Sequence, residues 1–184
     1  ENFGIRSLPN LETKFVAANT LIGLDKPAQT LLRNPDIEVK ENQLKELRHK
    51  YFTANTRKEK LQYQKQDKKL RQEIAKMLES DGWQTAVAKQ IVAFDPYDQN
   101  TFAPWFDPEW MFGLTYGFNV VIGNPPYGHT ITDKKDYFVK NYISAEGKHE
   151  IFKYFIEKGL RLLTKNGTLS YITSDTWTSL GYFK

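Results

Sequence analysis

Residues 123–128, Gly-Asn-Pro-Pro-Tyr-Gly, are the segment of this sequence whose residue types are best suited to chemistry. A proline fixes its own φ, lacks an N–H and pushes the preceding residue into an extended conformation, so Asn124-Pro125-Pro126 should be stiff. Such a loop presents the Asn124 side-chain oxygen and the Pro125 carbonyl as hydrogen-bond acceptors, with the Tyr127 ring beside them. Two acceptors on the N–H bonds of a conjugated amino group favour its tetrahedral form, whose lone pair can attack an electrophile.

The Tyr127 ring can stack on the planar group that carries such an amino nitrogen. If that group is a base within a duplex, it must first be extruded from the stack, which costs a few kcal/mol. The alternative interpretation is structural: Asn-Pro-Pro makes a rigid turn and the tyrosine packs. Ligands bind at the carboxyl ends of strands in open α/β sheets, so the position of the segment directly after a β-favouring run favours the chemical interpretation.

The elements around this segment predict a βαβ unit. Residues 118–122 are a nearly unbroken β-favouring run of the kind that a parallel sheet buries on both faces. Residues 151–163 have the pattern of an amphipathic helix, Asn166-Gly167 is its expected stop signal, and residues 168–173 read as another strand. A strand, a helix and a second strand in this order indicate a parallel α/β sheet.

The first half of the chain predicts a short buried strand within residues 13–21 and then a helical hairpin. Residues 36–81 contain no Gly or Pro and are rich in helix-favouring types. Thr56 and Glu59 have the spacing of a capping box, which places the start of the second helix. The two helices should pack through narrow apolar stripes, which comprise Leu44, Leu47 and Tyr51 in the first and Leu70, Ile74, Met77 and Leu78 in the second.

Residues 95–117 are expected to form an irregular loop, because Pro96, Pro104 and Pro108 interrupt helices and strands. The aromatic residues between 102 and 118 are interpreted as core and loop anchors. The alternative is that they form a surface on which bases stack.

Composition excludes several classes of protein. The chain has 184 residues, a formal net charge of +4 and no cysteine, which excludes disulfide frameworks, thiolate zinc sites and cysteine nucleophiles. It has no apolar run of about 18 residues or more, so a membrane span is not expected. His49, His129 and His149 lie far apart without metal-ligand spacing, and we expect no metal site.

Charge and aromatic residues are unevenly distributed along the chain. Residues 38–80 contain twelve Lys or Arg against seven Asp or Glu, whereas 20 of the 26 aromatic residues lie at or after Phe94. We interpret the basic hairpin as a solvated helical surface, because its charges are mixed in sign. The alternative is contact with DNA phosphates through lysines on its second helix, namely Lys58, Lys60, Lys65 and Lys68.

Residues 124–127, Asn-Pro-Pro-Tyr, resemble the catalytic motif of S-adenosylmethionine-dependent amino-methyltransferases. Residues 104–113 and 117–128 resemble the adenine-methylating part of type IIG restriction-modification enzymes and related adenine-specific DNA methylases. Residues 8–15 and 166–173 share this resemblance, which therefore covers most of the chain. The helical hairpin is its least distinctive part.

The resemblance implies a partial Rossmann-like methyltransferase fold, a parallel sheet with flanking helices, that carries a helical hairpin insertion. Residues 1–35 would begin the methyltransferase core, residues 36–90 would be the insertion, and residues 91–184 would be the core with the Asn-Pro-Pro-Tyr loop. The chain would be a fragment of a larger enzyme and inactive alone. A glycine-rich cofactor loop would lie upstream of it and a target-recognition domain downstream.

The resemblance also implies an activity, which is methyl transfer from S-adenosylmethionine to N6 of an adenine flipped out of double-stranded DNA, within a restriction-modification system. The implied catalytic residues are Asn124, Pro125, Pro126 and Tyr127. Asn19 would contact the cofactor's adenine, and Tyr127, Gly128 and His129 would contact DNA. No metal is required.

The implied enzyme is cytoplasmic, in a bacterium or archaeon, and a nuclease domain would belong to the same polypeptide. Two alternatives stay open. Asn-Pro-Pro-Tyr also occurs in enzymes that methylate N2 of guanine in RNA or the glutamine amide of a protein. The fold could instead serve as a non-catalytic DNA-binding module.

Overall fold

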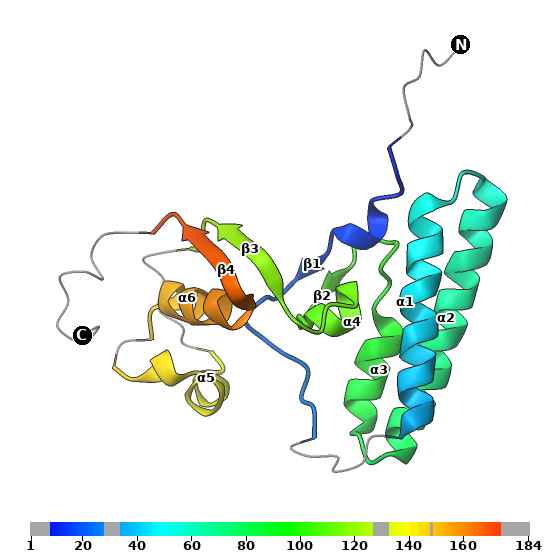
Figure 1. Ribbon diagram of the computed structural model, residues 1–184. Coiled ribbons are helices and arrows are strands. Elements are labelled where there is room, and N and C mark those ends of the chain that lie inside the picture. The colour runs from blue at the N-terminus through cyan, green and yellow to red at the C-terminus, as the bar shows by residue number, and fades with distance from the viewer. Residues whose placement is uncertain (1–7, 28–33, 127–132, 148, 174–184) are drawn as a thin grey trace, which may run out of the picture. The chain divides into compact units, whose positions relative to one another are not determined.

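The computed structural model describes residues 8–27, 34–126, 133–147 and 149–173 (Figure 1). The chain divides into two units, Glu1–Gly113 and Leu114–Lys184. Each contains helices and a pair of parallel strands, so the predicted α/β class is confirmed. Among the described residues, no helix is both long enough and apolar enough to cross a membrane.

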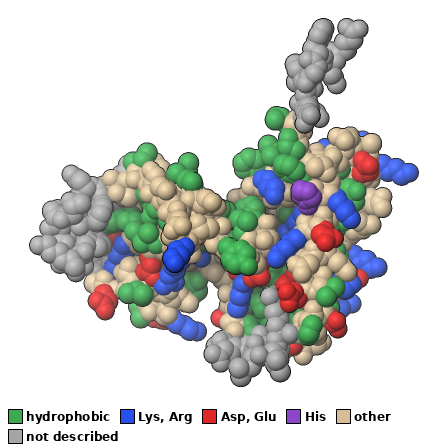
Figure 2. All heavy atoms as spheres, in the orientation of Figure 1, with side chains coloured by type: hydrophobic (Ala, Val, Ile, Leu, Met, Phe, Trp, Pro, Cys, Tyr) green, Lys and Arg blue, Asp and Glu red, His purple; other side chains and the backbone are tan. Residues whose placement is uncertain are grey.

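Helices α1 (Pro35–Thr53) and α2 (Arg57–Ser80) form the predicted hairpin. The expected capping box starts α2: the Glu59 backbone N–H donates to Thr56 Oγ1 at 3.2 Å, and the Thr56 N–H donates to Glu59 Oε2 at 3.1 Å. Asn34 caps α1, with its side chain accepting a backbone hydrogen bond from the first turn. Lys and Arg side chains are interspersed with Asp and Glu over the hairpin surface seen in Figure 2.

The hairpin packs much as its apolar stripes predict. Leu44, Leu47 and Tyr51 of α1 are buried, as are Ile74 and Leu78 of α2. The remaining two residues of the α2 stripe are only half-buried, because charged side chains take part of the interface. Helix α3 (Thr85–Ala93), which the sequence did not predict, packs against α2.

A parallel pair of very short strands flanks this helical segment in the sequence. Strand β1 (Ala17–Ala18) pairs with β2 (Phe102–Ala103). The strand expected within residues 13–21 is therefore wrong in extent, because Glu12–Lys14 forms the 3-10 helix η1 and only two residues reach the partner strand. Helices α1, α2 and α3 lie between two paired strands in the chain order.

Residues 95–117 are largely irregular, as predicted, and aromatic burial holds them. Trp105 and Trp110 are almost completely buried. The expectation missed strand β2 and the short helix α4 (Pro108–Phe112). Helix α4 starts here because the Asp107 side chain accepts from the Trp110 N–H at 3.0 Å while proline occupies the first helical position.

The second unit contains the predicted βαβ arrangement. Strands β3 and β4 pair in parallel, with Gly123 opposite Tyr171 at one end. Its elements are β3 (Phe118–Gly123), α5 (Lys135–Asn141), the 3-10 helix η2 (Ile143–Ala145), α6 (Ile151–Arg161) and β4 (Leu163–Tyr171). Helix α6 packs against β4.

The expectation that β3 is buried on both faces is wrong for the described residues. Val120 is 59% exposed and Ile122 is 75% exposed. These residues alternate along the strand and therefore share a face. Helix α6 packs against this two-stranded sheet, and within the part of the unit that the structure describes no second layer covers the face that carries Val120 and Ile122.

The stop signal assigned to Asn166-Gly167 is also wrong. Helix α6 ends at Arg161, and β4 already begins at Leu163. The two residues instead lie inside β4, where the register to β3 shifts between Phe118 and Val120. Asn166-Gly167 therefore accommodates an irregularity in the pairing of β4 with β3. Strand β4 starts earlier and is longer than predicted.

Candidate functional site

The Asn-Pro-Pro segment leaves the sheet at the carboxyl end of β3, as its position in the sequence predicts. The last ladder contact involves Gly123, whose carbonyl accepts from the Ile172 N–H at 3.1 Å. Asn124 is the next residue and is exposed, whereas Pro125 is buried and Pro126 is exposed. The buried Pro125 fixes the loop to the unit and leaves the neighbouring Asn124 exposed.

The chemistry available at this segment is hydrogen-bond acceptance. The Asn124 amide offers one side-chain oxygen with two lone pairs, and proline supplies carbonyl oxygens without any N–H. Tyr171, which pairs with Gly123 beside the segment, is half-buried, and burial raises the pKa of its phenol. Tyr171 therefore contributes a neutral hydroxyl beside the segment.

The predicted site also includes residues outside the Asn-Pro-Pro segment. Tyr127, Gly128 and His129 lie outside the described residues. Asn19 belongs to the first unit, whereas Asn124 belongs to the second. The predicted roles of all these residues stay predictions.

Asn19 directly follows β1, so it does close that strand. Its backbone N–H donates to the Ala103 carbonyl at 2.9 Å, and its Oδ1 accepts from the Leu21 N–H at 3.2 Å. The side chain is half-buried at the end of a parallel strand. An amide there can present both a donor and an acceptor to a ligand.

A buried charge network, which the sequence did not predict, joins the hairpin to the loop after it. Asp67 accepts from Arg48 Nε at 2.8 Å, from Arg71 Nε at 2.6 Å and from the Tyr97 hydroxyl at 3.2 Å. Burial and then the negative charge of Asp67 raise the pKa of Tyr97, so this phenol stays protonated. The sequence did contain one signal of this burial. Asp67 lies seven residues before the buried Ile74, and this helical spacing places both residues on the same face of α2.

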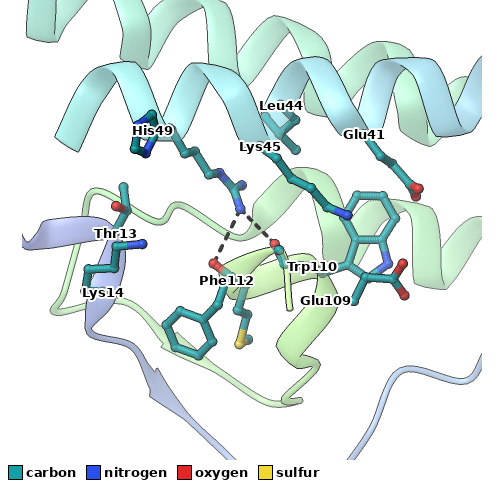
Figure 3. A pocket seen from close by; sticks show the side chains of 12 residues that line it. Thr13, Lys14, Glu41, Leu44, Lys45, His49, Glu109, Trp110 and Phe112 are labelled. Carbon is teal, nitrogen blue, oxygen red and sulfur yellow. Dashed lines mark hydrogen bonds between the residues drawn. The ribbon is translucent and has the colours of Figure 1, made fainter. Parts of the chain in front are cut away.

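A pocket of about 210 Å³ lies beside this network in the first unit (Figure 3). Its walls come from η1, α1 and α4, and Arg48 crosses it to donate to the Trp110 carbonyl at 2.8 Å. Three separate segments supply its side chains, so no local motif marked it in the sequence. No three His, Asp or Glu side chains of the described segments are grouped as metal ligands would be.

Known proteins similar to this chain include two that are named as methyltransferases. Over 76 residues, 36% of this chain, it is 34% identical to a type II methyltransferase, M.TthHB8I, of Thermus thermophilus. Over 68 residues, 33% of this chain, it is 38% identical to the type II restriction enzyme and methyltransferase RM.Eco57I of Escherichia coli. The matched segments span only 18% and 7% of the lengths of these relatives.

No solved structure matches this chain significantly. The sequence pattern of one family, described as Eco57I restriction-modification methylase, matches residues 12–184 and so spans nearly all of it. That span includes both paired strands of each unit and the Asn-Pro-Pro segment. The chain therefore belongs to the Eco57I restriction-modification methylase family.

Proposed function

We propose that this chain carries the methyl-transferring segment of an adenine-N6 DNA methyltransferase that uses S-adenosylmethionine. The observation that carries the proposal is the placement of Asn124. It is exposed, it directly follows the last paired residue of a parallel strand, and a buried proline holds it there. Family membership and the names of the two relatives support methylation within a restriction-modification system.

In the proposed mechanism, the Asn124 side-chain oxygen and the Pro125 carbonyl accept hydrogen bonds from the N6 amino group of a flipped adenine. These two bonds draw the nitrogen toward a tetrahedral geometry and free its lone pair for attack. Tyr127 stacks on the base, and Gly128 and His129 contact the DNA. The methylated nitrogen becomes positively charged, and it returns to neutral by releasing its proton to solvent.

When bound, S-adenosylmethionine would supply an electrophilic methyl group, whose bond to the sulfonium sulfur breaks as the bond to N6 forms, so that the sulfur leaves as a neutral thioether. Asn19 fits one part of it, because a half-buried amide at the end of β1 can match the donor and acceptor on the edge of an adenine ring. We assign Asn19 this positioning role.

The proposed fold is a partial Rossmann-like methyltransferase core. Residues 36–90 would be an insertion in it, a proposal supported by the chain order, in which α1, α2 and α3 lie between the paired strands β1 and β2. One relative is named as both a restriction enzyme and a methyltransferase. By analogy we propose that nuclease and target-recognition domains accompany this segment in its full-length protein.

Methyl transfer by the full-length protein tests the proposal. Cofactor with a labelled methyl group is offered with double-stranded DNA, with RNA and with a release-factor protein, and the labelled product is identified after digestion. We expect label on N6 of adenine in DNA, loss of that label in Asn124→Ala, and its retention in Asn119→Ala, an exposed asparagine on the same strand. Label on RNA or protein, or full DNA methylation by Asn124→Ala, would overturn the proposal.

A further inference from the structure

Hydrogen-bond donors line the pocket between η1, α1 and α4 (Figure 3), and the neighbouring residues do not supply an acceptor for every one of them. We propose that it binds a phosphate group. None of its lining residues belongs to the Asn-Pro-Pro segment, so this inference goes beyond the proposed methyl transfer.

The first argument is charge. Arg48 and Arg71 share one carboxylate, that of Asp67, so the buried network keeps one excess positive charge. Nε of Arg48 is bonded to Asp67 and Nη1 to the Trp110 carbonyl, but Nη2 is buried and has no hydrogen-bond partner among the described residues. A buried guanidinium N–H without an acceptor is costly, and an anionic oxygen at this position would remove that cost.

The second argument is a hydroxyl on the opposite wall. Thr13 in η1 is only 3% exposed and lines the pocket, and its Oγ1 also has no partner among the described residues. Two residues of the lining, from two elements, therefore each carry a buried polar atom without a partner among the described residues. Both can donate to a ligand.

The third argument is the rest of the lining. Lys14 and Lys45 add two ammonium groups, which can only donate hydrogen bonds. Two carboxylates, Glu41 and Glu109, also line the pocket, and Glu109 is paired with Lys26 at 3.3 Å. Donors that converge from several elements suit the oxygens of a tetrahedral phosphate group better than the two coplanar oxygens of a carboxylate.

Two sources could supply such a group, the DNA backbone or a free phosphate compound. Inorganic phosphate is the probe. It is titrated into the full-length protein at constant ionic strength against chloride, and heat of binding is measured. We expect saturable binding that weakens about tenfold in Lys45→Gln and in Thr13→Val, the loss of one hydrogen bond to a charged group.

Lys69→Gln is the matched control, because Lys69 is 78% exposed on α2 and lies outside this pocket. It should change the phosphate affinity by less than about twofold. If circular dichroism shows that Lys45→Gln is unfolded, Lys14→Gln is used in its place, because Lys14 is an exposed residue of the lining. Absence of saturable binding would overturn the proposal, as would equal weakening by Lys45→Gln and Lys69→Gln.

Double-stranded DNA then distinguishes the two sources, and either result supports a phosphate pocket. If DNA displaces phosphate, and Lys45→Gln lowers the salt dependence of DNA binding by about one phosphate contact, the backbone is the ligand. If DNA does not compete, the ligand is a free phosphate compound. Asn124→Ala should keep its phosphate affinity, so failure of the proposed methyl transfer and failure of this proposal can be told apart.

Discussion

The carboxylate of Asp67 on α2 accepts a hydrogen bond from Nε of Arg48 on α1 at 2.8 Å, and Asp67 is completely buried. Its other oxygen accepts from Arg71 at 2.6 Å. Asp67→Asn keeps the shape of this side chain but leaves two buried guanidinium groups without a counter-charge. We expect the free energy of unfolding, measured in urea, to fall by about 3–5 kcal/mol.

Glu73→Gln provides the comparison on the same helix. Glu73 accepts from Lys40 at 2.7 Å, but both side chains of this pair are about one-third exposed. Such surface pairs contribute about 0–1 kcal/mol. Equal losses in the two variants would contradict the importance that we assign to burial of Asp67.

Gly82 and Gly117 have the same φ of +89° but different surroundings. A Cβ on Gly117 would lie 2.6 Å from the Leu162 carbonyl oxygen, whereas nothing lies within 4 Å of a Cβ on Gly82. Gly82→Ala should lower the free energy of unfolding by about 1–2 kcal/mol, the cost of the left-handed backbone conformation. Gly117→Ala should cost about 1–3 kcal/mol more, because the clash adds to it.

Thermal unfolding of both variants checks this difference. Leu162 is the residue that connects α6 to β4, and its carbonyl also accepts from the Phe118 N–H at 2.8 Å. The clash therefore falls where β3 meets β4. Equal stability of the two variants would show that the backbone connecting α6 to β4 can move to relieve the clash without lowering the free energy of unfolding.

The hairpin was predictable because its determinants are local. Helix-favouring residues, the Thr56–Glu59 capping box and the apolar stripe of α1 act within a few turns of the chain. Strand β2 has no such determinants, since its two residues form a strand only by pairing with β1, far away in the sequence. Helix α5 begins at Lys135. The residue before it, Lys134, has a left-handed φ of 56° and provides no side-chain cap, so the start of the helix has no ordinary sequence pattern.

The candidate sites differ in the same way. The position of Asn124 at the end of β3 was predictable, because the strand and the prolines are consecutive in the sequence. The pocket was not, because Thr13, Arg48 and Trp110 come from three segments that only the tertiary structure brings together. Among the charged residues of α2, Asp67 and Arg71 are distinguished by their burial, which their residue types do not indicate.

We predict that the folded protein loses stability in acid because the Glu157 carboxylate becomes protonated. Its carboxylate accepts from the Ile143 and Ser144 backbone N–H groups at 3.0 and 2.7 Å. Burial would raise the pKa of Glu157, but the hydrogen bonds from Ser144 and Ile143 outweigh it and lower the pKa below its usual value of 4.5. Because the pKa is lower in the folded state, the stabilisation is complete above about pH 4.5 and is lost as the pH falls through the folded-state value.

Comparison with Glu157→Gln isolates this contribution. At pH 7 the variant should be less stable by about 1.5–3 kcal/mol, since a neutral amide accepts hydrogen bonds more weakly than a carboxylate. The difference in free energy of unfolding should shrink as the pH is lowered toward 3. A difference that stays constant over this range would contradict the assigned role of the ionised carboxylate.

Asn124→Asp tests whether Asn124 acts as a hydrogen-bond acceptor, as the proposed function requires. Asn124→Ala removes the acceptor and should lower kcat for DNA methylation in the full-length protein by about 10²–10³-fold. Asn124→Asp keeps an acceptor oxygen at the end of β3 and should retain an intermediate rate. DNA affinity, measured separately, should change little in Asn124→Ala, because the lost interaction strengthens only as charge develops on the nitrogen. If Asn124→Asp is as inactive as Asn124→Ala while both fold and bind DNA, the acceptor role is wrong, and the amide N–H₂ group, which both variants lack, must take its place.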